Sequence, residues 1–152
     1  MRRIRPARLE EAEALSSLCK RSKAHWGYDA EFLRRADASL NVTPQEIERG
    51  RVLVCEDADL VTGVISVVPM AEPNTYDLMH LFVEPGAIKS GVGRALFNAA
   101  VSFMRKRGGK KLLILSDPNA AEFYRRLGAI DIGEAPSDAI PERLLPLLEF
   151  SL

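Results

Sequence analysis

The stretch LFVEPGAIKSGVGRALF, residues 81–97, decides the fold. It begins as an apolar strand that Pro85 ends, and it continues into a helical pattern with Gly91 and Gly93 directly in front of it. Glycine inside a helix costs roughly 0.5–1 kcal/mol relative to alanine. Two glycines at a helix start therefore indicate that something must come close to the backbone there.

The start of this helix is a natural place for a phosphate group. Unpaired N–H groups and a partial positive charge favour an anion at any helix N-terminus, and Lys89 and Arg94 can add charge. A Walker loop is excluded, because Val92 and Gly93 stand where lysine and a hydroxyl residue should follow the second glycine. A dinucleotide fingerprint fails because Leu96 replaces its third glycine.

The surrounding elements predict an α/β domain. Apolar periodicity and turn residues give the order strand, two helices, three antiparallel strands, helix, strand, helix and final strands. Strands are expected at 2–7, 51–57, 60–70, 76–85, 110–116, 129–133 and 144–152, and helices at 8–23, around Phe32, at 43–50, 92–107 and 117–128. A hairpin turn is expected at Asp57 and Ala58. Asp117 is the expected N-cap of the last helix, with Pro118 as its first residue.

This order predicts one domain over residues 1–152, a mixed central sheet flanked by helices. The crossover through residues 93–107 should leave its two flanking strands parallel and adjacent. We find no repeat and no linker in the sequence.

Composition narrows the function. The 152 residues carry 21 Lys plus Arg and 21 Asp plus Glu, so no net charge favours nucleic acid or an anionic membrane. Two cysteines and two histidines form neither a disulfide framework nor a cluster with metal spacing. No apolar run approaches the roughly 18 residues of a membrane span, and no secretory signal opens the chain. We expect a soluble cytoplasmic protein without a metal.

The 81–97 stretch resembles the acetyl-CoA-binding core of the GCN5-related N-acetyltransferase (GNAT) superfamily. The shared pattern is a strand ending in Leu-x-Val-x-Pro, followed by Gln/Arg-x-x-Gly-x-Gly/Ala at the start of a helix. The family's second pattern, a helix with Phe-Tyr and a terminal glycine, is similar to DPNAAEFYRRLGA, residues 117–129. One departure is Ile88 at the Gln/Arg position, with Lys89 after it.

The resemblance implies a GNAT-like fold and transfer of an acetyl group from acetyl-CoA to an amine by direct attack. Tyr124 lies at the family's tyrosine position and is the expected acid for the leaving thiolate; the alternative is a core tyrosine. The family binds the cofactor through the strand before the loop, the loop itself and the last helix. Here these positions are Leu81, Phe82, Val83, Lys89, Ser90, Gly91, Val92, Gly93, Arg94 and Asn119.

The general base is open between Asp77 and His80. Asp77 matches a position where many relatives carry glutamate, and His80 has the better unperturbed pKa, about 6.5. The alternatives are a solvated acid at a strand edge for Asp77 and a core histidine for His80. Three residues apart on a regular strand, the two side chains face opposite sides.

The acceptor pocket is expected at His25, Trp26 and Tyr28, because the connection between the first two helices borders that pocket in the superfamily. An aromatic cluster there could hold an apolar or a cationic amine, or it could be a hydrophobic plug over the core. We expect a small-molecule or peptide amine as acceptor and a possible homodimer. A non-catalytic acyl-CoA-binding sensor or interaction module with the same fold is the alternative function.

Overall fold

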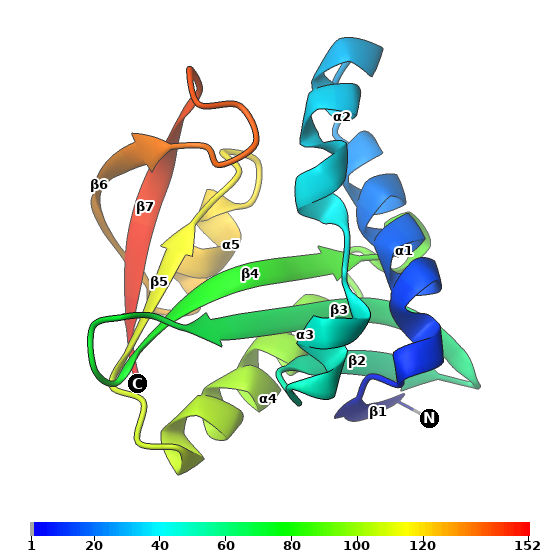
Figure 1. Cartoon of the computed structure of the whole chain (residues 1–152), viewed down its shortest axis with the longest axis horizontal. Coiled ribbons are helices and arrows are strands. Elements are labelled where there is room, and N and C mark those ends of the chain that lie inside the picture. Colours follow the sequence, from blue (N-terminus) through cyan, green and yellow to red (C-terminus); the bar gives the residue numbers. More distant parts are fainter. Residues whose placement is uncertain (1) are drawn as a thin grey trace. The chain divides into compact units, whose positions relative to one another are not determined.

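A computed structural model describes residues 2–152 (Figure 1). The strands are β1 (Arg2–Pro6), β2 (Val52–Asp57), β3 (Leu60–Pro69), β4 (Thr75–Val83), β5 (Lys111–Leu115), β6 (Ile130–Pro136) and β7 (Leu144–Ser151). The α-helices are α1 (Ala12–Ala24), α2 (Ala30–Ala36), α3 (Pro44–Glu48), α4 (Val92–Lys106) and α5 (Ala121–Arg126). Three short 3-10 helices are η1 (Leu9–Glu11), η2 (Asp37–Leu40) and η3 (Pro85–Ala87).

The strands form one mixed sheet in the order β1-β2-β3-β4-β5-β7-β6. The predicted crossover is confirmed, because β4 and β5 are adjacent and parallel, with Thr75 opposite Lys111 and Asp77 opposite Leu113. The pairs β1–β2, β2–β3, β5–β7 and β6–β7 are antiparallel. The predicted mixed α/β fold with flanking helices is therefore confirmed.

By its internal contacts the chain divides into two compact units. The first unit contains the chain through Val67 together with Met79–Ala100. The second unit contains Val68–Leu78 and Val101–Leu152. Strands β3 and β4 and helix α4 each pass from one unit to the other, so the chain crosses between units inside regular elements and not through a linker.

The first unit is held by an apolar layer between sheet and helices. Its fully buried side chains include Leu15 and Leu18 of α1, Val54 and Ile65 of the sheet, and Leu96 of α4, each no more than 2% exposed. Helices α1 and α2 run side by side (Figure 1). The second unit has its own buried set, formed by Met104, Leu112, Ile114 and Leu148.

Helix α4 packs unusually close to strand β3 at Gly63. A Cβ atom at Gly63 would lie 2.8 Å from Leu96 Cδ1, 2.8 Å from Val92 Cγ1 and 3.2 Å from the Phe82 carbonyl oxygen. Val92 and Leu96 are themselves buried, at 2% and 0% exposure. The missing side chain of Gly63 is therefore the space into which the first turns of α4 fit.

Local sequence signals place most element ends correctly. Thr43 accepts a hydrogen bond from the Glu46 N–H at 3.2 Å, which confirms it as the N-cap of α3. The hairpin turn between β2 and β3 lies one residue later than expected: Ala58 and Asp59 take the two positive φ angles, 50° and 66°, of a tight two-residue turn.

The start of the last helix differs from the prediction. Helix α5 begins at Ala121 with Ala120 as its N-cap, and not at residue 117. The Asp117 carboxylate instead accepts the Asn119 N–H at 2.8 Å, and the Asp117 carbonyl accepts the Ala120 N–H at 2.9 Å. Aspartate stabilises such a turn as readily as a helix cap, so the Asp-Pro signal marks a turn and the helix cap predicted at Asp117 is wrong.

We predict that Gly63→Ala destabilises the fold by about 1–3 kcal/mol, the usual cost of inserting a methyl group into a packed core. Thermal unfolding of the variant measures this. Gly86→Ala is the matched control, because a Cβ at Gly86 would meet no heavy atom within 4 Å. Equal melting temperatures for Gly63→Ala and the parent would contradict the close packing.

Candidate functional site

The predicted glycine loop is a tight turn that leads straight into helix α4. Strand β4 ends at Val83, η3 follows, and the Ser90 N–H donates to the Ala87 carbonyl at 3.2 Å. Lys89 and Gly91 take positive φ angles of 68° and 90°, a region that glycine enters without strain. Gly91 is therefore required by the path of the backbone.

The first turn of α4 presents donors at the end of this loop. The Ala95 N–H donates to the Gly91 carbonyl at 3.0 Å. In any α-helix the N–H groups before the first such bond have no partner within the helix. In α4 these belong to Val92, Gly93 and Arg94. They point along the helix axis with the positive end of its dipole, so the arrangement suits an anion.

Arg2 is a neighbour of the loop that the sequence did not reveal. Its Nη2 donates to the Ser90 carbonyl at 2.7 Å, and a Cβ on Gly91 would lie 3.2 Å from its Nη1. A guanidinium group thus lies against the loop from the N-terminal strand. The only sequence signal is the basic run Arg2-Arg3, and nothing local connects it with residues 88 positions away.

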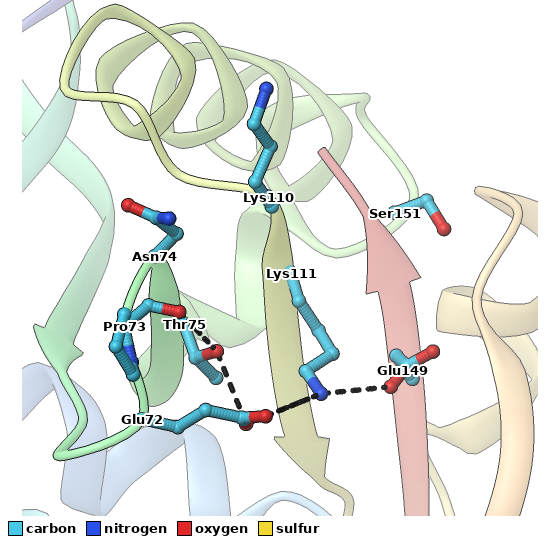
Figure 2. A pocket seen from close by; sticks show the side chains of 8 residues that line it. All are labelled: Glu72, Pro73, Asn74, Thr75, Lys110, Lys111, Glu149 and Ser151. Carbon is cyan, nitrogen blue, oxygen red and sulfur yellow. Dashed lines mark hydrogen bonds and ion pairs between the residues drawn. The ribbon is translucent and has the colours of Figure 1, made fainter.

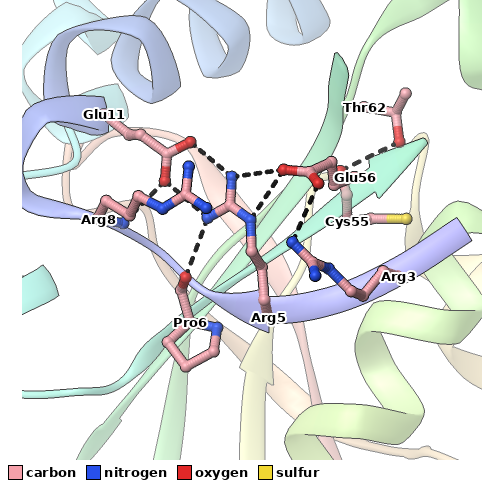
Figure 3. A network of polar contacts seen from close by, with 8 residues as sticks. All are labelled: Arg3, Arg5, Pro6, Arg8, Glu11, Cys55, Glu56 and Thr62. Carbon is pink, nitrogen blue, oxygen red and sulfur yellow. Dashed lines mark hydrogen bonds and ion pairs between the residues drawn. The ribbon is translucent and has the colours of Figure 1, made fainter. Parts of the chain in front are cut away.

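Strand β1, which carries Arg2, is fixed by an ion-pair network shown in Figure 3. Arg5 donates to both oxygens of Glu11 at 2.9 and 2.8 Å and to Glu56 at 2.9 Å. These half-buried bonds hold the pKa of Glu11 below its usual range, chiefly through the Arg5 hydrogen bond. Arg3 adds a 3.2 Å bond to Glu56. The network ties β1 to β2 and to η1.

A second ion pair holds the other end of the loop. Arg21 of α1 donates two hydrogen bonds to the Glu84 carboxylate, from Nε to Oε1 at 3.0 Å and from Nη2 to Oε2 at 2.6 Å. Glu84 directly precedes η3, and its N–H donates to the Thr62 carbonyl at 2.8 Å. The predicted cofactor strand, Leu81, Phe82 and Val83, is half-buried just before it.

His80 is buried, at 2% exposure, with both ring nitrogens engaged. Nε2 lies 3.2 Å from the Ser39 carbonyl, which can only accept, so Nε2 carries the proton. Nδ1 then accepts the Ser66 hydroxyl at 2.7 Å. The Glu46 carboxylate is 3.7 Å from Nδ1, yet burial still lowers the pKa of His80. This arrangement fits the core-histidine alternative better than a base that contacts substrate.

Asp77, the other predicted base, is less buried than His80, and its pKa is raised and not lowered. It is half-buried on β4, opposite Leu113 of β5. Burial, and to a lesser degree the negative charge of Asp138, raises the pKa of Asp77 to about 6. A carboxylate with this pKa is ionised at neutral pH and is a far better proton acceptor than an ordinary aspartate. Of the two predicted bases, the electrostatics favour Asp77.

Tyr124 and Asn119 belong to the second unit. Tyr124 is 6% exposed, and its ring meets the Phe123 ring edge-on at 5.2 Å between centroids. Burial, followed by the charge of Asp117, raises the pKa of Tyr124 well above its usual value. The hydroxyl is therefore protonated at neutral pH and gives up its proton less readily than an exposed tyrosine does. Asn119 is exposed in the turn before α5.

The predicted acceptor residues lie together between α1 and α2. His25 ends α1, Gly27 turns the chain with a φ of 81°, and Asp29 caps α2 by accepting the Phe32 N–H at 2.8 Å. The His25 and Trp26 rings meet edge-on at 5.4 Å. Trp26 is 44% exposed, and the acceptor role of these residues stays a prediction.

A hollow of about 350 Å³ opens at the N-terminal ends of β4 and β5 (Figure 2). Its lining is Glu72, Pro73, Asn74, Thr75, Lys110, Lys111, Glu149 and Ser151. Lys111 lies between Glu72 at 3.2 Å and Glu149 at 3.7 Å. None of the predicted site residues lines this hollow, and ligands of parallel strands bind at the opposite, carboxyl ends. The hollow is therefore not part of the candidate site.

Residues 2–152 show neither a ready group of metal ligands nor a helix that could cross a membrane. No group of three or more His, Cys, Asp or Glu side chains in that range is placed to hold a metal ion. None of the helices described there combines the length and the apolar character needed to cross a bilayer.

Comparison with known proteins points to one family. Residues 48–128 match the family model of the acetyltransferase (GNAT) domain, whereas no curated protein matches the sequence significantly. The fold is similar to PaiA N-acetyltransferase from Thermoplasma acidophilum in complex with coenzyme A, with a TM-score of 0.81 and 17% identity over 100% of this chain and 99% of that one.

Two other solved structures are similar. A GCN5-related N-acetyltransferase from Rhodopseudomonas palustris has a TM-score of 0.79 and 20% identity, over 99% of this chain and 95% of that one. The putative acetyltransferase YncA from Salmonella typhimurium, with its cofactor acetyl-CoA, has a TM-score of 0.73 and 20% identity, over 100% and 94%. These identities establish a shared fold. Because the family model covers more than half of the 152 residues, the chain belongs to the GNAT acetyltransferase family.

Proposed function

We propose that this protein transfers an acetyl group from acetyl-CoA to a primary amine of a small molecule or peptide. The observation that carries the proposal is the loop before α4 in a chain of the acetyltransferase family. There Gly91, at a φ of 90°, turns the backbone so that α4 begins at Val92. Two of the similar folds bind coenzyme A or acetyl-CoA.

The loop and the first turn of α4 hold the pyrophosphate of the donor. The N–H groups of Val92, Gly93 and Arg94 donate to it, as anions bind at helix N-termini. Lys89 and Arg94 lie at the turn and offer two positive charges. Ser90 shapes the turn, because its hydroxyl donates to the Ala87 carbonyl. Asn119 binds the pantetheine arm. The apolar side chain of Ile88 cannot bond a phosphate, so the positive charge at this end of the loop comes from Lys89 or Arg2.

Transfer proceeds by direct attack of the amine on the thioester carbon. A free alkylammonium has a pKa of about 10.4, so it must lose a proton before it can attack; Asp77 accepts this proton, directly or through water. Backbone N–H groups of Leu81, Phe82 and Val83 stabilise the oxyanion of the tetrahedral intermediate. The C–S bond then breaks, and Tyr124 donates its proton to the departing thiolate.

Other roles follow from the same arrangement. His25, Trp26 and Tyr28 bind the acceptor. His80 acts through its neighbours: it connects η2 to strand β3 through Ser39 and Ser66 and so supports the segment after α2. A homodimer, a single domain over residues 1–152 and a cytoplasmic location stay predictions from the sequence.

The decisive experiment follows release of free CoA from acetyl-CoA across a panel of amines, alongside calorimetric titration with CoA. Turnover with at least one amine supports the transferase. Tight CoA binding without turnover on a broad panel would favour the non-catalytic sensor instead.

We predict that Gly93→Val weakens CoA binding at least about tenfold, equivalent to about 1.4 kcal/mol, because its side chain enters the space of the phosphates. Valine is no worse than glycine inside a helix, so the melting temperature without ligand should change little. Calorimetry and a melting curve test the two parts. A folded variant that binds CoA as tightly as the parent would refute the phosphate-cradle assignment.

We predict that Arg2→Gln weakens CoA binding by up to about fivefold, since attraction between two exposed opposite charges, here the guanidinium and a phosphate, contributes about 0.2–1 kcal/mol. The neutral side chain removes positive charge beside Gly91 and loosens the hold on the Ser90 carbonyl. Arg3→Gln is the matched control, because Arg3 bonds Glu56 on the same strand. If both variants have the same affinity for CoA, Arg2 has no part in the site.

We predict that kcat/KM falls on the acid side with an apparent pKa near 6, because Asp77 must be ionised to accept a proton. Asp138→Asn removes a like charge, so the pKa of Asp77 falls and the acid limb moves to lower pH. Asp77→Asn should abolish this limb and lower the rate by about 10²- to 10⁴-fold. Profiles between about pH 5 and 8 decide this; an acid limb that persists unchanged in Asp77→Asn identifies another base.

A further inference from the structure

A stacked aromatic pair at the start of α2 already binds a cation of the protein itself. The rings of Tyr28 and Phe32 lie parallel, 3.9 Å apart between centroids and 11° apart in plane. The Lys23 ammonium of α1 lies 5.2 Å from the Tyr28 centroid and 5.7 Å from the Phe32 centroid. Both distances are within the roughly 6 Å over which a cation is attracted to an aromatic face.

This contact reveals the chemistry of the surface. The Lys23 ammonium lies within cation–π distance of both rings, so Lys23 acts as an internal probe for alkylammonium binding. The pair lies beside His25 and Trp26, whose rings meet edge-on at 5.4 Å. Trp26 is 44% exposed.

We propose that Tyr28 and Phe32 bind a cationic nitrogen of the acceptor, which displaces the Lys23 ammonium. This inference rests on the proposed function and names its substrate class. The nitrogen that attacks the thioester must be uncharged, whereas the nitrogen held by the rings must be charged. The two are therefore different atoms, and the acceptor is a primary amine that carries a second, cationic nitrogen.

Lys23 has a distinct role in this scheme. While no acceptor is bound, its ammonium lies beside the ring pair, at nearly equal distances from the two centroids. It also competes with every ligand of the same charge, so it sets the affinity of the site. Lys20, one turn earlier on α1, pairs with Asp37 at 3.2 Å and provides a matched lysine whose charge faces a carboxylate.

Binding can be tested without turnover. Trp26 is the only tryptophan of the chain, so its fluorescence reports on ligands at this segment. The probe is choline, a quaternary ammonium with no transferable N–H, and its neutral isostere is 3,3-dimethyl-1-butanol. We expect choline to bind the intact protein and the isostere to bind several-fold more weakly. Equal binding of the two would overturn the cation assignment.

The variants separate a binding role from a structural one. Lys23→Gln should tighten choline binding by about two- to fivefold, the range of an exposed cation–π contact, whereas Lys20→Gln should leave it unchanged. Tyr28→Leu should abolish binding and Tyr28→Phe should retain it. If Lys23→Gln lowers the melting temperature and does not tighten binding, the contact only fastens α1 to α2 and the proposal is wrong.

Turnover then distinguishes the source of the second cation. The acceptors are 1,5-diaminopentane, a lysine-containing tripeptide and 1-aminopentane, each followed by CoA release. Preference for either dibasic acceptor over 1-aminopentane supports the proposal, and the better of the two identifies a small diamine or a peptide. A preference for 1-aminopentane refutes it. Absence of turnover on all three, with choline binding intact, contradicts the proposed function alone.

Discussion

The contact between helix α4 and Gly63 is the constraint on which the rest of the first unit depends. Helices normally approach a sheet at the distance set by side chains on both surfaces. Here one side chain is absent, and Val92 and Leu96 occupy its place at 2.8 Å from where a Cβ would lie. Because Val92 is the first residue of α4, this contact fixes the start of the helix itself. The donors of the first turn are therefore placed by this packing together with the backbone turn at Gly91.

Two arginines secure the two sides of the same loop, one by an ion pair and one by a hydrogen bond to a carbonyl. Arg21 holds Glu84 before it, and Arg2 holds the Ser90 carbonyl within it. Exposed contacts of this kind contribute little to the free energy of unfolding individually. They matter because the directional N–H groups of each guanidinium hold one side of the loop in a fixed position. The half-buried Arg5 network supports the loop indirectly, because it fixes the strand from which Arg2 extends.

The sequence predicted what local chemistry determines. The strand ending before Pro85, the glycine turn and the cap at Thr43 all depend on residues within one or two turns of the chain, and all are present. The error at Asp117 is also local, since a carboxylate caps a turn and a helix with the same bond. Arg2 beside Ser90 and Lys23 over Tyr28 could not be read in this way. The Arg2 contact joins strand β1 to a distant loop. The Lys23 contact depends on the path of the chain through Gly27.

Burial has opposite effects on the pKa values of Asp77 and His80, the two titratable residues of β4 considered as bases. Burial disfavours charge in both cases, so it lowers the pKa of His80 and raises that of Asp77. For the histidine the result is a neutral ring at physiological pH, and its two hydrogen bonds satisfy that neutral form completely. For the aspartate the same effect moves the pKa to about 6, with Asp138 adding to it. The lowered pKa keeps His80 neutral in the core, and the raised pKa makes Asp77 a stronger base than an ordinary aspartate. The unperturbed pKa values had favoured His80 as the base.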